Sequence, residues 1–305
     1  MNTPKICLLG GDLRQLSLAQ TLCERGCECA LWGVRLPDAE SASSGGFPGV
    51  RCADAASAVS GSRAVVLPLP ATTDGVRVHC PMPDPGLPEV RHELRLTHLL
   101  SLMPRGVPLL AGRAPEVLRA MARDARVPLI DYYDCEEVQI RNSVPTAEGA
   151  LALVLRELPV TIFGTSFAVL GYGRVGRRLS ESLRALGAAV TVAARSEEQL
   201  AWARLSGCRA VPLAEYLAAP PPCAAVFNTI PTPIVPAAYL DALPPEAVYI
   251  ELASAPGGLE SGAAKSSGRR ILRAPSLPGK TAPRTAGQIL GDAVVHILEK
   301  EGVLA

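Results

Sequence analysis

Short apolar runs alternate with amphipathic stretches along the first half of the chain. Helical spacing of apolar residues predicts helices over 13–25, 87–102 and 115–125, and a Ser-, Gly- and Pro-rich stretch predicts a loop over 36–49. The apolar runs predict strands at 5–10, 28–32, 64–67, 107–111 and 129–131. Strands that alternate with helices in this way are typical of an open parallel sheet.

The second half of the chain repeats this alternation. Predicted strands 166–170, 189–193, 210–211, 225–228, 248–252 and 270–273 lie between two predicted helices, 146–158 and 285–301. Pro145 precedes the first of these helices, Thr146 is its expected N-cap, and Glu148 lies in its first turn. We therefore predict an α/β protein with two doubly wound parallel-sheet (Rossmann-like) domains around a cleft, joined by a long helix. The predicted first domain is 1–145, to which the C-terminal helix 285–305 is a candidate addition. The predicted second domain is 146–284.

A glycine-rich turn follows the predicted strand 166–170. It consists of Gly171, Tyr172, Gly173, Arg174, Val175 and Gly176. Gly171 permits a tight turn, Gly173 lets the backbone approach a pyrophosphate, and Gly176 lets the next helix pack on the sheet. With 27 glycines in the chain the motif alone is weak. The apolar strand before it, and the helix after it with Leu179, Leu183 and Leu186 at helical spacing, favour a dinucleotide site over an ordinary turn.

The end of the next strand indicates which dinucleotide binds. NAD sites usually place Asp or Glu there to accept the ribose hydroxyls, but this chain has Arg195 and Ser196. A guanidinium beside a hydroxyl suits a 2′-phosphate, so we predict NADP in preference to NAD. The alternative is that Arg195 is a solvated surface arginine.

Further candidates lie where later strands end, because ligands of open α/β sheets bind beyond the carboxyl ends of the strands. We expect the ribose and nicotinamide of the cofactor to lie along Asn228, Thr229, Ile230, Pro231 and Ala253. The Asn228 amide either hydrogen-bonds the ribose or carboxamide, or only forms the turn before a Pro-rich loop.

Three groups are candidates for handling a substrate. Arg14 follows a strand-to-helix turn that lacks the third glycine, so this turn either binds an anion or is a plain turn. Lys280, one of four lysines, lies in a predicted loop over 277–283 that Gly and Pro stiffen; it is either a fixed cation for a carboxylate or a surface lysine. His79 lies on an extended segment and is a candidate acid–base group.

Composition narrows the class of protein. A length of 305 residues with 48% hydrophobic residues fits two domains, and a net charge of +1 gives no electrostatic case for nucleic acid or a membrane surface. No export signal precedes the first strand, and no run of 18 apolar residues predicts a membrane span, so we expect a cytoplasmic protein. Cys23, Cys27 and Cys29 cluster without a second ligand pair, which favours reduced, packed thiols over a metal site.

Seven segments together resemble the family of dipicolinate synthase A subunits. They run in order over nearly the whole chain: 10–14, 67–70, 142–149, 171–176, 194–196, 227–231 and 277–283. The pairing of Asn142-Ser-Val-Pro-Thr-Ala-Glu-Gly149 with Leu277-Pro-Gly-Lys-Thr-Ala-Pro283 is the specific part, and Ser276 departs from the glycine expected there. More distantly, the second domain resembles 2-hydroxyacid dehydrogenases and adenosylhomocysteinase.

The resemblance implies oxidation of dihydrodipicolinate, or its hydrated precursor, to dipicolinate (pyridine-2,6-dicarboxylate), with hydride transfer to NADP. It also implies the flavoprotein-like B subunit of dipicolinate synthase as partner and the cytoplasm of a sporulating mother cell as the setting. A small dianion needs clamps, for which Arg14, Asn142, Thr146 and Lys280 are the candidates. The proton goes to Glu148, His79 or water.

Two other functions fit the motifs. One is a 2-hydroxyacid-type dehydrogenase, which the absence of histidine between His98 and His296 disfavours. The other is a non-catalytic regulatory subunit that binds NADP. A homodimer is expected only because twofold assemblies are common.

Overall fold

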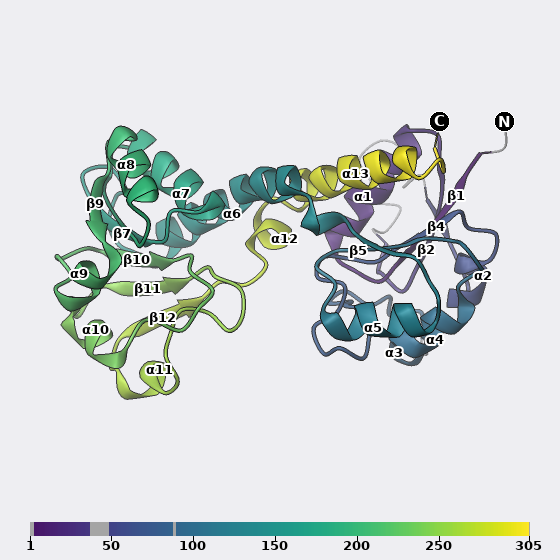
Figure 1. Cartoon of the computed structure of the whole chain (residues 1–305), viewed down its shortest axis with the longest axis horizontal. Coiled ribbons are helices and arrows are strands. Elements are labelled where there is room, and N and C mark those ends of the chain that lie inside the picture. The colour runs from purple at the N-terminus through teal and green to yellow at the C-terminus, as the bar shows by residue number, and fades with distance from the viewer. Residues whose placement is uncertain (1–2, 37–48, 88–89, 305) are drawn as a thin grey trace. The chain divides into compact units, whose positions relative to one another are not determined.

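The computed structural model describes residues 3–36, 49–87 and 90–304. The chain forms two compact units, each an α/β fold (Figure 1). Unit 1 comprises Met1–Arg141 and Pro283–Ala305, and unit 2 comprises Asn142–Ala282. Nearly all of the loop predicted over 36–49, and residues 88–89 of the helix predicted over 87–102, lie outside the described residues.

The sheet of unit 1 has six parallel strands in the order β3-β2-β1-β4-β5-β6. The strands are β1 (Lys5–Leu9), β2 (Glu28–Trp32), β3 (Val50–Arg51), β4 (Ala64–Val66), β5 (Leu109–Ala111) and β6 (Leu129–Asp131). The chain winds outward from β1 in both directions, so the strand order reverses between β1 and β4. This is the doubly wound topology.

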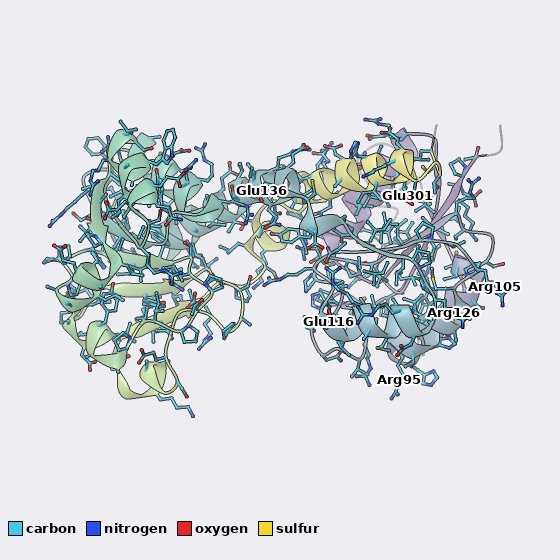
Figure 2. The ribbon with its side chains drawn as sticks, viewed as in Figure 1. Arg95, Arg105, Glu116, Arg126, Glu136 and Glu301 are labelled. Atoms are coloured by element: carbon cyan, nitrogen blue, oxygen red, sulfur yellow. The ribbon has the colours of Figure 1, made fainter. Side chains whose placement is uncertain are left out.

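Helices cover both faces of this sheet because successive strand residues point to opposite sides. Ile6 and Leu8 join one core with α1 (Leu13–Glu24) and α13 (Pro283–Lys300), whereas Cys7 and Leu9 join the other core. The helices on or near that second face are α2 (Ala55–Val59), α3 (Val90–Glu93), α4 (Leu96–Leu102) and α5 (Glu116–Asp124). Charged side chains such as Arg105, Glu116 and Arg126 lie on the outside of the unit (Figure 2).

Unit 2 repeats the topology with the strand order β12-β11-β10-β7-β8-β9, all parallel. Its strands are β7 (Ser166–Leu170), β8 (Ala189–Ala194), β9 (Arg209–Pro212), β10 (Ala225–Asn228), β11 (Val248–Glu251) and β12 (Arg270–Arg273). The strand order reverses between β7 and β10. The predicted fold class, two doubly wound parallel-sheet domains, is therefore confirmed.

Two hydrophobic cores flank the sheet of unit 2. Phe167 and Val169 face α6, α7 and α8, whereas Ala168 and Leu170 face α9, α10 and α11. The helices are α6 (Glu136–Glu157), α7 (Arg174–Ala185), α8 (Glu197–Leu205), α9 (Leu213–Ala218), α10 (Ala237–Ala242), α11 (Ala263–Ser266) and α12 (Leu277–Thr281). Within the described residues, we find no helix whose length and hydropathy suit a membrane span.

Helix α6 corrects one prediction. It begins at Glu136, not at Thr146, and Pro145 lies inside it. Thr146 is therefore no N-cap, and Glu148 is not in a first turn. An internal proline costs about 3 kcal/mol, but Val138 on one side and Ala147 on the other are buried in hydrophobic cores, which outweighs this loss.

A second correction concerns the loop predicted over 277–283. Residues Leu277–Thr281 form a short helix, α12, because proline is tolerated in the first turn of a helix. Ser276 precedes it with φ 59° and ψ 34°, the left-handed conformation that glycine adopts freely. This backbone shape explains why glycine is the residue expected at position 276.

Smaller differences follow from local packing. The short elements β3 and α2 were not predicted, and the helix predicted over 87–102 is broken between α3 and α4. Leu186, expected on the buried face of α7, is 47% exposed because that helix ends at Ala185. Gly187, with φ 81°, ends this helix as glycine commonly does.

The close packing of α13 on α1 can be tested by replacing Gly287, a substitution that has two opposing effects on stability. Alanine favours helix by about 1 kcal/mol over glycine, but a Cβ on Gly287 would run into the Arg14 carbonyl oxygen and lie 2.5 Å from Ser17 Cβ. We expect Gly287→Ala to lower the free energy of unfolding by about 1–3 kcal/mol, measured by urea denaturation. Gly268→Ala is the control, because its Cβ meets open space. A Gly287→Ala protein as stable as the wild type would show that the helices can separate freely.

Candidate functional site

The glycine turn of unit 2 lies between β7 and α7, where the strand order reverses. Gly171 has φ 92°, which favours glycine, and a Cβ there would lie 2.6 Å from Thr229 Oγ1. A Cβ on Gly176 would run into the backbone carbonyl of Gly171. Both glycines are therefore needed for the first turn of α7 to approach the ends of β7 and β10.

Gly173 differs from these two glycines. It is the N-cap residue of α7, no side chain caps the helix there, and a Cβ on Gly173 would meet no atom within 4 Å. The space beside Gly173 at the start of α7 is therefore open, and a helix N-terminus carries a partial positive charge. This is the geometry in which a helix binds the pyrophosphate of a dinucleotide.

The other residues of the motif have distinct positions. The Tyr172 side chain is buried, and its hydroxyl donates to Ser206 Oγ at 3.0 Å, so only its backbone faces the turn. Arg174 is exposed and Val175 is half-buried in the first turn of α7. Arg177 lies over the Tyr172 ring, 5.5 Å from its centroid, and holds that ring against the helix.

Arg195 follows the last residue of β8 and is exposed. Its guanidinium has no hydrogen-bond or ion-pair partner among the described residues. Ser196 is the N-cap of α8 and accepts a hydrogen bond from Gln199 N at 3.4 Å, which leaves its hydroxyl hydrogen available. Both side chains thus stand at the position where a 2′-phosphate is expected.

Asn228 does not have the open position expected of a cofactor ligand. The residue is 0% exposed, its Nδ2 donates to the Ile230 carbonyl at 2.9 Å, and its Oδ1 accepts from Ile230 N at 3.2 Å. Thr229 Oγ1 donates to the Leu170 carbonyl at 2.8 Å. The Asn228 amide therefore shapes the turn after β10, while Ile230, Pro231 and Ala253 are partly or fully exposed near the strand ends.

Glu251 is the centre of a hydrogen-bond network that the sequence did not reveal. This carboxylate, 5% exposed, lies at the end of β11. It accepts from Asn228 Nδ2 at 2.7 Å, Ala253 N at 3.1 Å, Gly258 N at 2.9 Å and the Tyr249 hydroxyl at 3.3 Å. Burial, followed by the charge of Glu251, raises the pKa of Tyr249 well above its usual range. Glu251 thereby ties the turns after β10 and β11 together.

The two segments that carry the family resemblance contact each other within unit 2. A Cβ on Gly149 of α6 would lie 2.9 Å from both Leu277 Cβ and Thr281 Oγ1 of α12, so glycine is needed for this contact. The predicted site residues around it are Asn142, which is buried; Thr146, whose hydroxyl donates to the Asn142 carbonyl at 2.8 Å; and Glu148 and Lys280, which are exposed.

In unit 1, the corresponding turn between β1 and α1 is covered by another segment of the chain. Gly11 N donates to the His79 carbonyl at 2.9 Å, and the guanidinium of Arg14 donates to Asp12 Oδ2 at 2.8 Å and the Leu69 carbonyl at 2.6 Å. Burial alone would raise the pKa of Asp12, but the hydrogen bonds and charge of Arg14 lower it. Arg14 is only 5% exposed. Of the two interpretations, this geometry favours the plain turn, with Arg14 as a buried partner of Asp12.

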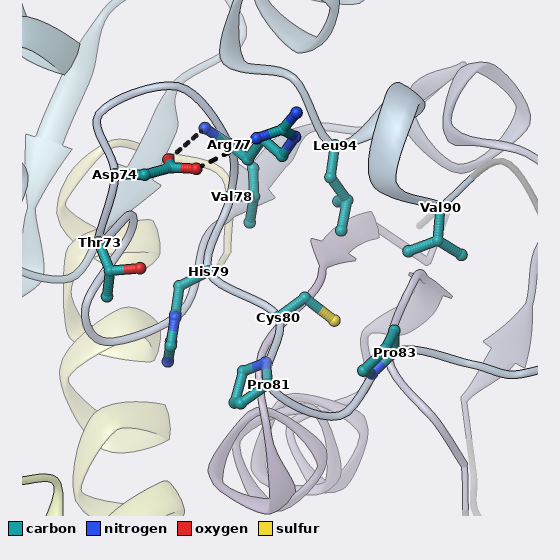
Figure 3. A pocket seen from close by; sticks show the side chains of 10 residues that line it. All are labelled: Thr73, Asp74, Arg77, Val78, His79, Cys80, Pro81, Pro83, Val90 and Leu94. Atoms are coloured by element: carbon teal, nitrogen blue, oxygen red, sulfur yellow. Dashed lines mark hydrogen bonds and ion pairs between the residues drawn. The ribbon is translucent and has the colours of Figure 1, made fainter.

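His79 lies on the wall of a pocket of about 460 Å³ in unit 1 (Figure 3). Val78, Cys80 and Leu94 make much of this wall apolar, and Asp74 with Arg77 forms an ion pair of 3.4 Å on it. Burial lowers the pKa of the His79 imidazole; the charge of Asp12 opposes this shift and that of Arg14 adds to it. His79 is therefore a neutral, half-buried imidazole at pH 7.

Metal chemistry has no candidate site within residues 3–36, 49–87 and 90–304. No three His, Cys, Asp or Glu side chains there come together in a way that could hold an ion. Cys23 is half-buried and Cys27 and Cys29 are buried, all as free thiols packed with the core between α1 and β2.

The hydrogen-bond network around Glu251 can be tested by substitution, because it is expected to hold the turns after β10 and β11 together. A glutamine at position 251 would bring an NH2 group against donors, leaving buried hydrogen bonds unmade. We expect Glu251→Gln to lower the free energy of unfolding by about 1–3 kcal/mol in urea denaturation. Glu246→Gln, at an exposed position in the same unit, is the control and should change little. Equal stability of the two variants would mean that the network does not constrain the fold.

Known proteins resemble this chain in sequence and structure. Residues 5–133 match the family model of the N-terminal domain of the dipicolinate synthase A subunit. The dipicolinate synthase A subunit of Bacillus subtilis (strain 168) is 33% identical over 300 residues, which cover 96% of this chain and 95% of that protein.

Solved structures agree with this relation. The A chain of dipicolinate synthase from Bacillus subtilis has a TM-score of 0.81 at 31% identity, covering 98% of this chain and 97% of that one. The corresponding dipicolinate synthase chain from Bacillus halodurans has a TM-score of 0.82 at 28% identity, covering 98% and 99%. A transhydrogenase from Sinorhizobium meliloti, 16% identical with a TM-score of 0.63 over 99% of this chain and 94% of that one, shares the fold. The chain belongs to the family of dipicolinate synthase A subunits.

Proposed function

We propose that this chain is the dehydrogenase subunit that oxidises dihydrodipicolinate to dipicolinate, with NADP as the hydride acceptor. One observation carries the proposal: in a chain of this family, the uncapped N-terminus of α7 faces open space at Gly173, and the unpaired Arg195 follows the next strand. The first feature suits a pyrophosphate and the second suits a 2′-phosphate.

The cofactor contacts follow from these positions. The N–H groups at Gly173, Arg174 and Val175 bind the pyrophosphate, and the guanidinium of Arg195 with the Ser196 hydroxyl binds the 2′-phosphate. The turns after β10 and β11, with Ile230, Pro231 and Ala253, receive the nicotinamide half, and Asn228 acts on it through the shape of the turn. When bound, NADP supplies the acceptor for a hydride.

The substrate is a small dianion, and its carboxylates need cationic or polar partners. Lys280 is the strongest candidate, because it is exposed and lies on α12, whose position is fixed by close packing against Gly149. Thr146 and Asn142 lie on the same helix as Gly149 and are the proposed polar partners. Arg14, whose guanidinium donates to Asp12, contributes by keeping the turn between β1 and α1 in place.

The reaction removes a hydride from one ring carbon of dihydrodipicolinate and a proton from a neighbouring position, and the ring becomes aromatic. Because aromaticity drives this step, orientation and charge placement matter more than a strong base. The neutral imidazole of His79 can accept the proton, since burial lowers its pKa. Glu148, exposed on α6, is the alternative acceptor, and water the third.

The family is named for one component of a larger enzyme, so we propose a second component, the flavoprotein-like B subunit of dipicolinate synthase, as the partner. The proposed setting is the cytoplasm of a sporulating mother cell. Association of this chain into a homodimer stays a prediction. The hydrated precursor of dihydrodipicolinate is the alternative substrate for the same site.

Arg195 offers a direct test of cofactor choice. Arg195→Asp removes the cation and adds a charge that repels a 2′-phosphate, so the ratio of NADP to NAD affinity should fall by about 100-fold or more. Calorimetric titration with each dinucleotide measures this ratio. Arg204→Asp, at an exposed position on α8, is the control and should leave the ratio unchanged. An unchanged ratio in Arg195→Asp would refute the assignment of NADP.

The reaction itself is tested with freshly generated dihydrodipicolinate and NADP. The chain, alone or together with the B subunit, should form NADPH, followed by its absorbance. Lys280→Gln should raise KM by about 10- to 100-fold because a charge-assisted hydrogen bond to a carboxylate is lost. Lys265→Gln, at another exposed lysine of unit 2, is the control. No NADPH in either mixture would contradict the proposed activity and favour a regulatory role.

A further inference from the structure

A second pocket in unit 2 lies at the opposite ends of the strands from the glycine turn. Ser166, Ala189 and Arg209, the first residues of β7, β8 and β9, all line it, and its volume is about 280 Å³. Five strand residues span about 16 Å, so a molecule in this pocket does not reach the proposed dinucleotide site. The pocket is thus separate from the function proposed above.

The lining of this pocket is positively charged. Arg184 and Arg209 contribute guanidinium groups, and no Asp or Glu is among the residues that line it. Among the described residues, neither guanidinium has a hydrogen-bond or ion-pair partner. Arg178 and Arg270 of the same unit pair with Glu181 and Glu157, whereas Arg184, Arg209 and, at the proposed cofactor site, Arg195 have no such partner among the described residues. Two unpaired cations on one pocket favour an anionic ligand.

Arg184 has a defined position. It lies in the last turn of α7, and a Cβ on Gly207 would lie 2.6 Å from its Nη2, so the guanidinium rests against the Gly207 backbone. A cation near a helix C-terminus also interacts favourably with the helix dipole. That interaction does not account for Arg209, which begins a strand and faces the same pocket.

Tyr216 is a buried aromatic residue of the lining. It is 1% exposed, and its hydroxyl has no hydrogen bond of normal geometry among the described residues. The hydroxyl oxygen is itself buried beside Tyr239 and Cys223, so a ligand in the pocket would not contact it. Burial, followed by the nearby Tyr239 and Cys223, holds the pKa of Tyr216 well above its usual range. Tyr216 therefore stays protonated and contributes no charge to the pocket.

We propose that this pocket binds a small dicarboxylate with an apolar body, held by Arg184 and Arg209. Phe167, Val190 and two prolines give the pocket apolar walls, which suit a hydrocarbon or aromatic body and which inorganic phosphate would not use. Small-molecule sites hold about 300–1,000 Å³, so a volume of about 280 Å³ fits a dicarboxylate and is too small for a dinucleotide.

The test uses the full chain and benzene-1,3-dicarboxylate as the probe, with benzoate and inorganic phosphate as comparison ligands, in calorimetric titrations. Arg184→Gln and Arg209→Gln should each weaken binding of the dicarboxylate by about 10-fold or more, because each removes a charge-assisted hydrogen bond. Tyr216→Phe should bind as the wild type does, because the hydroxyl is buried away from the ligand. Arg204→Gln, at an exposed position outside the pocket, should bind as the wild type does.

Three outcomes would overturn the proposal: no binding of the dicarboxylate to the wild type, unchanged binding in both arginine variants, or phosphate binding as tight as that of the dicarboxylate. Benzoate should bind at least about 10-fold more weakly than the dicarboxylate, since it offers one carboxylate. Thermal unfolding of each variant checks the fold.

Discussion

The close approach of α7 to β7 is the constraint on which the proposed cofactor site depends. Gly176 lies against the backbone carbonyl of Gly171, and Thr229 of the neighbouring strand end lies against Gly171 itself. A side chain at Gly176 would displace backbone, and one at Gly171 would run into the side chains of Thr229 and Ile230 at a φ of 92° that favours glycine. The result is that the first turn of α7 stands directly over the point where the strand order of unit 2 reverses, with its N–H groups uncapped.

Unit 1 has the same strand order, but its turn between β1 and α1 is bonded differently from the glycine turn of unit 2. The N–H of Gly11 is bonded to the His79 carbonyl, and Asp12 caps α1 through the backbone N–H of Arg14. The segment that supplies His79 also bonds to the residues that follow β2, through Met82 with Arg35 and Asp84 with Gly33. A shared topology therefore leaves one unit with an open helix terminus and the other with a terminus that its own chain covers.

Much of this architecture was predictable because it depends on local sequence patterns. The strands β7, β10 and β12 were predicted with the bounds that the structure has, since short apolar runs and flanking turns define them. The glycine turn was predictable for the same reason. The start of α6 was not, because Pro145 is a common start signal and only tertiary packing of Val138 shows that the helix begins earlier. The role of Glu251 was missed because its bond to Asn228, 23 residues away, depends on the pairing of β10 with β11.

The central claim is that the open N-terminus of α7 holds a dinucleotide pyrophosphate, and Gly173→Val tests it most directly. A Cβ at Gly173 meets no protein atom within 4 Å, and the residue's φ of −80° suits any amino acid, so the variant should fold as the wild type does. Its side chain would occupy the space proposed for the pyrophosphate. We predict an unchanged thermal unfolding temperature together with loss of NADP binding in a calorimetric titration. Wild-type affinity for NADP in Gly173→Val would contradict the account.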